Sequence, residues 1–247
     1  MRHGSLSTIT FVLLVVLLAI LAGVNVFLPQ GDFLPLENLP AEKPVLALVN
    51  AGIMIFLYGA LGLVGLVLAR KLGFPDLWDR AVSNWERFGL PALAGIGLGL
   101  LFIGADLFFS RMHPFGLLPH PPFPTSLVAS AVAGIGEEIV FRLFFVSFWL
   151  WLVSHVLLGK RWQGRVFWIV AVASALAFTA AHVPSLVFLL DLGHIGDVPI
   201  PLLAELLLLN GALSLFAADF LRKYGFLAPV GLHFWTDVVW HVLWGMV

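Results

Sequence analysis

Seven long apolar segments constrain the fold of this 247-residue chain more than any other feature of its sequence. About 20 apolar residues cross the hydrocarbon core of a bilayer. The seven segments lie near Thr8–Leu28, Pro44–Ala69, Phe88–Phe109, Ser126–Leu152, Val166–Val183, Leu202–Leu221 and Ala228–Met246. Only 11% of the residues are charged, against about 25% in a soluble domain. The sequence therefore predicts an all-α, polytopic transmembrane helix bundle with about seven spanning helices.

The basic residues indicate how the bundle is oriented. The N-terminus and the second, fourth and sixth loops carry ten Lys and Arg residues, whereas the other three loops carry only Lys43 and Arg111. Basic residues in short loops mark the cytoplasmic side, so we predict that the N-terminus lies inside and the C-terminus outside. We expect an integral protein of a bacterial cytoplasmic membrane, with membrane lipid as its surroundings. A net charge of −1 offers no basic surface for nucleic acid.

Three charged residues stand together in the fourth apolar segment. Glu137, Glu138 and Arg142 are the only charged residues from position 126 to position 158, and each would cost about 2.5–3.5 kcal/mol at the bilayer centre on the insertion scale. Glu138 and Arg142 are four residues apart, so they share a helix face and can form a structural ion pair. Glu137 is rotated by about 100° from that face. It lacks this partner and is a candidate general base or acid.

Two further polar motifs follow on later segments. Phe178 and His182 lie near the end of the fifth segment, and His233 and Asp237 lie four apart on the seventh. A His and an Asp on one helix face can bind a metal together or hold a reacting oxygen. Their alternative role is a hydrogen bond within the packed bundle. The other polar residues are left outside the predicted site: Asp106, Glu205, Asn210, Asp219, His3, His113, His120, His155, His194 and His241.

The three motifs in this order resemble the CAAX prenyl endopeptidase and bacteriocin-processing family of intramembrane proteases, also called the Abi or CPBP family. The matching residues are the run from Glu137 to Arg142, the run from Phe178 to His182, and the run from His233 to Asp237. The resemblance covers about residue 126 to the C-terminus. It divides one integral membrane domain into N-terminal helices without a recognisable motif (residues 1–124) and a catalytic helix core (residues 125–247).

The resemblance implies an endopeptidase that cuts a membrane-associated or prenylated, CAAX-type protein or peptide. Glu137, helped by His182, would take a proton from water, while His233 with Asp237 would stabilise the oxyanion. Prenyl-protein enzymes of the family have Asn where this chain has Asp237. An ionised Asp would repel an oxyanion, so Asp237 is either protonated, or orients His233, or binds a metal. In a metal-dependent version Glu137, His182 and His233 would be ligands of one zinc ion; otherwise no cofactor is needed.

Two other function classes fit the buried polar residues. A proton-coupled transporter would use them as a relay, and a non-catalytic membrane scaffold or immunity protein would keep the fold without the chemistry.

The motifs also pose a geometric problem. With about 1.5 Å of rise per residue, Glu137 lies ~17 Å from the outer start of its helix, and His182 and His233 lie ~25 and ~10 Å from the inner starts of theirs. Tilted helices, a longer fourth helix or shifted boundaries must bring the three together, and we expect the fifth helix to start deeper in the membrane.

Overall fold

The computed structural model describes residues 2–31 and 41–247. Every regular secondary-structure element in these residues is a helix, and turns and loops connect the helices. Six helices in this described part are long and apolar enough to cross a membrane. The first two are α1 (Arg2–Asn25), followed by a continuous helix made of α2 (Lys43–Ile53), η3 (Met54–Tyr58) and α3 (Gly59–Lys71). The protein is an integral membrane protein, as its sequence predicts.

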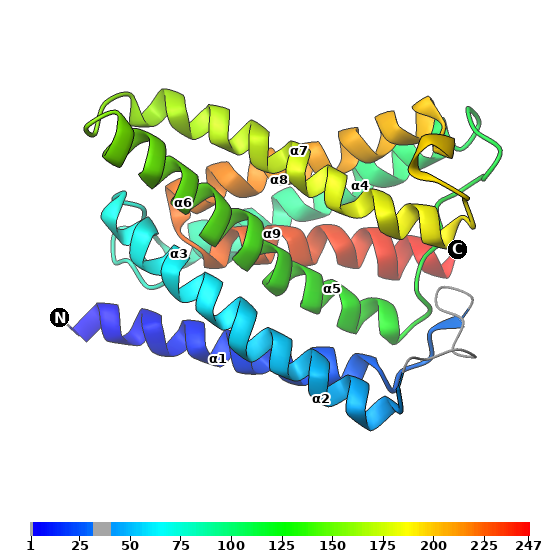
Figure 1. Cartoon of the computed structure of the whole chain (residues 1–247), viewed down its shortest axis with the longest axis horizontal. Coiled ribbons are helices and arrows are strands. Elements are labelled where there is room, and N and C mark those ends of the chain that lie inside the picture. The colour runs from blue at the N-terminus through cyan, green and yellow to red at the C-terminus, as the bar shows by residue number, and fades with distance from the viewer. Residues whose placement is uncertain (1, 32–40) are drawn as a thin grey trace.

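The remaining helices form the larger part of the bundle (Figure 1). The third span joins η4 (Trp85–Gly89) to α4 (Leu90–Phe109), and the fourth runs through α5 (Thr125–Glu137), η5 (Glu138–Val146), α6 (Ser147–Leu150) and η6 (Trp151–Leu157). Then follow α7 (Gln163–Leu189), the short η7 (Ile195–Asp197), α8 (Ile200–Tyr224), α9 (Leu227–Asp237), η8 (Val238–Leu243) and η9 (Trp244–Met246).

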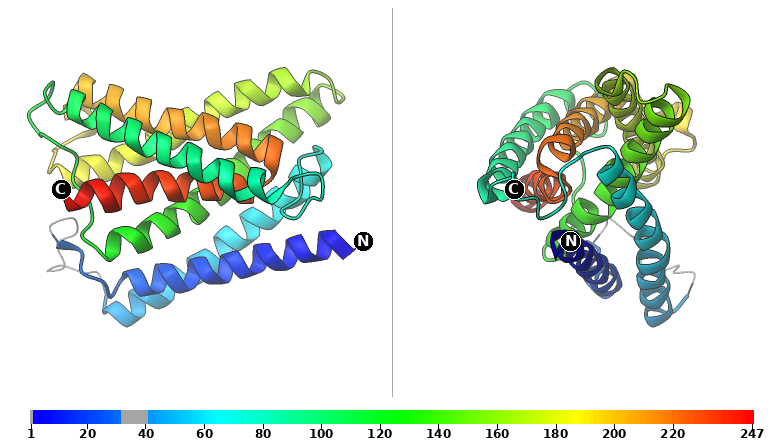
Figure 2. Two further views of the ribbon diagram at one scale, coloured as in Figure 1. Left: turned by 180° about the vertical axis from the view of Figure 1, so that it is seen from behind. Right: turned by 90° about the vertical axis from the view of Figure 1, so that its left-hand side faces the viewer.

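The seventh predicted segment is also helical, but it is shorter than expected. α9 has 11 residues and its π-helical continuation η8 has 6, which gives 17 before the last turn. This is below the about 20 residues that cross the hydrocarbon core. The helix nevertheless lies at the centre of the bundle, where it packs against α4, α5 and α8. Figure 2 shows it enclosed between these neighbours, while α1 and the α2–α3 helix lie on one side of the molecule.

Close approach of α9 to α4 depends on glycine. A Cβ on Gly95 would meet the backbone oxygen of Leu232 in α9, and a Cβ on Gly99 would meet the side chain of Val239 in η8. Small residues let helix backbones approach closely in membranes. The two glycines therefore set the position of the helix that carries His233.

Two helices extend beyond their predicted ends. The fourth helix extends over residues 125–157, and α7 continues through Pro184 to Leu189 instead of ending at Val183. A proline inside a membrane helix is tolerated, because neighbouring groups can satisfy the freed backbone carbonyl. The expectation that the fifth helix starts deeper is wrong. α7 starts at Gln163, before the expected Val166, and its first turns extend beyond the start of α9 (Figure 1).

Candidate active site

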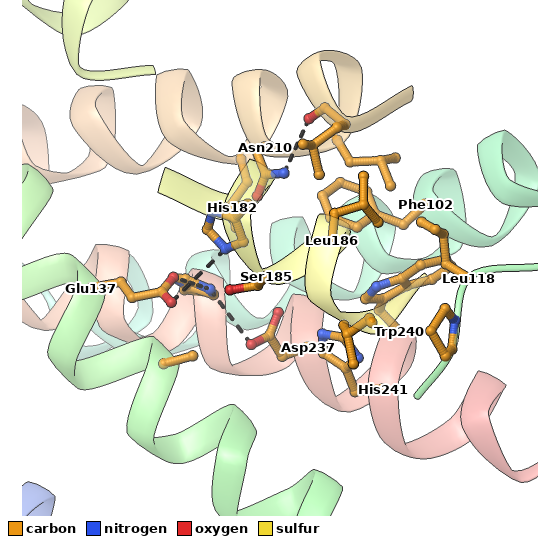
Figure 3. A pocket seen from close by; sticks show the side chains of 17 residues that line it. Phe102, Leu118, Glu137, His182, Ser185, Leu186, Asn210, Asp237, Trp240 and His241 are labelled. Carbon is orange, nitrogen blue, oxygen red and sulfur yellow. Dashed lines mark hydrogen bonds and ion pairs between the residues drawn. The ribbon is translucent and has the colours of Figure 1, made fainter. Parts of the chain in front are cut away.

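A cavity of about 230 Å³ lies between the helices of the larger part of the bundle. Most of its lining is apolar, but Glu137, His182, His233 and Asp237 all border it (Figure 3). They come from α5, α7 and α9, three separate helices. The structure thus brings together all four residues that the sequence nominates for catalysis, although their roles stay predictions.

Glu137 is the last residue of α5, and its side chain opens onto this cavity. About a third of the side chain (32%) is exposed. Its Oε1 lies 3.9 Å from His182 Nε2, and its Oε2 lies 3.7 Å from His233 Nε2. These distances are too long for direct hydrogen bonds. Glu137 therefore faces both imidazoles across gaps that a small molecule or a proton can bridge.

The tautomer of His182 follows from its contact with the helix backbone. Its Nδ1 lies 2.8 Å from the carbonyl oxygen of Phe178, one turn earlier in α7. A carbonyl oxygen only accepts hydrogen bonds, so Nδ1 carries the hydrogen and donates it. Nε2 of the neutral ring is then an acceptor, and it is the atom that faces Glu137. The Phe178 ring packs edge-to-face with the imidazole, with ring centroids 4.7 Å apart, and holds it in this orientation.

Glu138 connects the first motif to the third. Its Oε1 lies 2.8 Å from His233 Nδ1, and its Oε2 lies 3.2 Å from Arg142 Nε. The side chains of Glu138 and Arg142 are fully buried, and the contact between them is an ion pair that lacks the alignment of a hydrogen bond. The Arg142 guanidinium also lies 4.4 Å from the centroid of the Phe178 ring, a cation–π distance. A continuous series of charged and polar contacts thus joins Arg142 to His233 through Glu138.

Asp237 lies on the opposite side of the His233 ring from Glu138. Its Oδ2 is 3.5 Å from Nε2, the nitrogen that also faces Glu137. Asp237 therefore does not hold His233 through Nδ1, because that nitrogen already contacts Glu138. The sequence leaves three roles open for Asp237, and one of them is to orient His233. This orientation is supplied mainly by Glu138.

π-helical backbone begins directly after Glu137 and directly after Asp237. α5 changes to η5 between Glu137 and Glu138, and α9 changes to η8 between Asp237 and Val238. Insertions of π-helix are frequent at functional sites, because the wider turn changes the direction of the side chains that follow. Glu138, the first residue of η5, contacts His233 of α9, and helix spacing alone does not reveal this contact.

The metal hypothesis receives no geometric support from the described residues. No group of three or more His, Cys, Asp or Glu within residues 2–31 and 41–247 is arranged so that it could hold a metal ion. Glu137 Oε1 lies 3.9 Å from His182 Nε2, and Glu137 Oε2 lies 3.7 Å from His233 Nε2. A zinc ligand set of these three residues stays a prediction, and no chemical step below depends on it.

Comparison with known proteins gives one match. Residues 119–239 match the family described as type II CAAX prenyl endopeptidase, Rce1-like. This part of the chain belongs to the Rce1-like family. The matched range contains all three motifs, from Glu137 to Asp237. No curated protein and no solved structure gives a significant match.

The match to the Rce1-like family supports, in general terms, an intramembrane protease. Residues 1–118 lie outside the match, and the domain division at residues 124 and 125 stays a prediction.

Several cavity residues were outside the predicted site. Ser185, Asn210 and His241 line the cavity, and His120 contacts His241. Asn210 was predicted to pack or to line a groove, and its side-chain amide donates to the carbonyl of Leu206. Asp237 and His241 are four residues apart, so this spacing could have indicated His241, whereas no such signal identifies Ser185 or His120. The sequence hides Ser185, because Pro184 suggests that the helix ends before it, whereas α7 continues for another turn and a half.

Proposed function

We propose that this protein is an intramembrane endopeptidase that hydrolyses a peptide bond of a membrane-associated or prenylated, CAAX-type substrate with a water molecule activated by Glu137 and His182. The observation that carries the proposal is the convergence of Glu137, His182 and His233 on one cavity within the bundle. The match to the Rce1-like family supports the same reaction class.

The gap between Glu137 and His182 has the size of a bridging water. Two hydrogen bonds of about 2.8 Å from one water oxygen span the 3.9 Å between Glu137 Oε1 and His182 Nε2. Both atoms are acceptors when Glu137 is ionised, because His182 carries its hydrogen on Nδ1. A water that donates to both keeps its lone pairs free for attack on a carbonyl carbon. Glu137 accepts the proton that the attacking water loses.

His233 is placed to stabilise the oxyanion that this attack creates. An imidazolium is favoured by the Glu138 carboxylate at Nδ1, in the way a carboxylate supports the histidine of a catalytic triad. The protonated Nε2–H then points toward the side of the ring that Glu137 and Asp237 share. Donors of this kind contribute about 10²–10³ in rate. Asp237 acts with His233 in its protonated form, because an ionised carboxylate would repel the oxyanion.

Collapse of the tetrahedral intermediate needs a proton on the leaving amine. Glu137, which took that proton from water, returns it to the amine nitrogen, so the carboxylate is regenerated at the end of the cycle. One water is consumed, the peptide bond breaks, and a new carboxylate and a new amine are released. The cavity walls keep these steps away from bulk water, which strengthens each electrostatic interaction.

The lining of the cavity suits an apolar substrate segment. Beyond the polar cluster it consists mainly of large apolar side chains, namely Phe102, Leu118, Leu186, Leu189, Leu206, Leu209, Leu213 and Trp240. A membrane-associated peptide with aliphatic residues next to the cleaved bond would bury those residues there, at about 25 cal/mol per Å² of apolar surface. This supports a substrate that approaches from within the membrane.

Cleavage by purified protein in lipid vesicles tests the proposal. A prenylated CAAX-type peptide and its unprenylated counterpart are incubated with the wild type, and mass spectrometry locates any new carboxyl terminus. We expect cleavage of the prenylated peptide, and no cleavage with Glu137→Ala. A proton-coupled transporter would instead show charge movement without cleavage, and a scaffold would show neither. Full activity of Glu137→Ala would contradict the proposed role of Glu137.

A further inference from the structure

A pair of histidines joins the cavity to the loop between α4 and α5. His120 in this loop and His241 in η8 face each other through their Nδ1 atoms, which are 3.0 Å apart. His241 lines the cavity (Figure 3), whereas His120 packs edge-on against Trp240 with ring centroids 4.7 Å apart. Neither residue belongs to the three motifs. The mechanism proposed above uses neither of them.

The burial of His120 determines which ring carries the shared hydrogen. Its Nε2 is buried and has no hydrogen-bond partner among the residues that the structure describes. A buried N–H without an acceptor is rarer than a buried acceptor without a donor, so His120 carries its hydrogen on Nδ1. It donates this hydrogen to Nδ1 of His241. The neutral ring of His241 must then carry its own hydrogen on Nε2.

His120 stays neutral at ordinary pH. Burial lowers the pKa of His120 below its usual value, because it disfavours the charged ring, and the nearby carboxylate of Asp106 offsets this only in part. The assignment of one hydrogen to each ring therefore holds near pH 7. His241 keeps an N–H on Nε2, for which no hydrogen bond is found in the described part of the chain.

His241 lies at a useful distance from the reacting groups. His233, Asp237 and His241 follow at intervals of four residues along α9 and η8, which places His241 about 12 Å beyond His233. Three residues of an extended peptide span about 10–11 Å, a comparable length. Asp237 lies between the two histidines on the helix, and the cavity wall also includes the apolar side chains of Leu206 and Trp240. A CAAX-type sequence has three residues after its cysteine, two of them aliphatic, and these would form the leaving segment if the bond after the cysteine is the one that is cut.

We propose that His241 is a substrate-binding residue, whose Nε2–H donates a hydrogen bond to an oxygen of the last residue of the leaving segment. His120 is the positioning residue that fixes the tautomer of His241. The acceptor chemistry is an sp² oxygen, which the terminal carboxylate and the last peptide carbonyl both supply. This inference rests on the proposed function, and it adds that the enzyme measures the length of the segment that it releases.

Steady-state kinetics of His241→Phe in vesicles test the inference. Phenylalanine keeps the ring and removes the donor, so we expect KM to rise about 3- to 10-fold, the equivalent of one hydrogen bond, with kcat little changed. His241→Gln, whose amide N–H can occupy the place of Nε2, should recover most of the loss. His155→Phe is the matched control, because His155 contacts Gln163 and does not line the cavity.

Altered substrates locate the bonded oxygen. If it belongs to the carboxylate, a peptide that ends in a carboxamide binds the wild type more weakly and His241→Phe equally well. If it belongs to the last peptide carbonyl, replacement of that carbonyl by a methylene gives this pattern instead. A peptide with one extra residue should lose the dependence on His241.

His120→Leu should reproduce the KM defect, and His120→Asn, which retains a donor near Nδ1, should not.

The outcomes separate this inference from the proposed function. Cleavage that is equally efficient in wild type and His241→Phe, with all substrates, would overturn the role of His241 and leave the peptidase intact. Absence of cleavage by the wild type would overturn both. A loss with His241→Phe that His241→Gln fails to restore, accompanied by a lower unfolding temperature, would show a structural role and contradict the inference.

Discussion

The same substitution at two adjacent glutamates should change the stability of the protein by very different amounts. Glu138→Gln removes the counter-charge of Arg142, whose side chain is fully buried, and weakens the contact with His233. Removing one partner of a buried ion pair costs about 3–5 kcal/mol, because the other charge is left uncompensated. Glu137→Gln removes a charge that is a third exposed and has two further carboxylates nearby, so we expect its effect on stability to stay within about 1 kcal/mol.

Unfolding in mixed micelles of increasing SDS content, followed by tryptophan fluorescence, measures this difference. Glu138→Gln should lower the free energy of unfolding by about 3–5 kcal/mol relative to Glu137→Gln. Arg142→Met in the Glu138→Gln background should cost much less than the sum of the two single changes, because no buried charge then remains unpaired. Equal stability of Glu137→Gln and Glu138→Gln would refute the assignment of Glu138 to structure and Glu137 to the cavity.

Three further predictions follow from particular contacts. Asp237→Asn should retain most of the peptidase activity, since its amide can donate to the oxyanion beside His233, whereas Asp237→Leu should lose about 10²-fold or more; inactivity of both would favour a role for the carboxylate itself. Burial lowers the pKa of His113, so the unfolded chain binds that proton more tightly and stability should fall as the pH drops below about 6.5. His113→Gln should reduce this pH dependence in thermal unfolding, and an unchanged profile would contradict it. Gly95→Leu should separate α4 from α9 and destabilise the protein by about 1–3 kcal/mol, whereas Gly97→Leu, with open space around its Cβ position, should be close to neutral in the same assay.

The sequence predicts the class of fold because a membrane leaves few alternatives. Backbone polar groups in hydrocarbon must be satisfied within the segment, so each long apolar run is expected to be a helix, as six of them are. Ends are harder to predict. Pro184 suggested the end of a helix that continues to Leu189, because neighbouring helices can compensate for the missing hydrogen bond. The short seventh helix is held by packing against α4, α5 and α8 rather than by its length.

Contacts within one helix could be predicted, and contacts between helices could not. The spacing of Glu138 and Arg142 places them on one face, and they lie 3.2 Å apart. The contact of Glu138 with His233 joins residues that are 95 positions apart. It depends on how α9 packs against α5, which leaves no pattern in the sequence. The pairing of His120 with His241 is hidden for the same reason.

The central claim is that Glu137 activates the water that cleaves the peptide bond. The most direct test is the cleavage rate of Glu137→Gln in vesicles, compared with the wild type at equal amounts of folded protein. General base catalysis contributes about 10²–10⁴ in rate, so the account predicts a loss of at least about 10²-fold with unchanged thermal unfolding. A variant that cleaves the peptide at the wild-type rate would contradict the account.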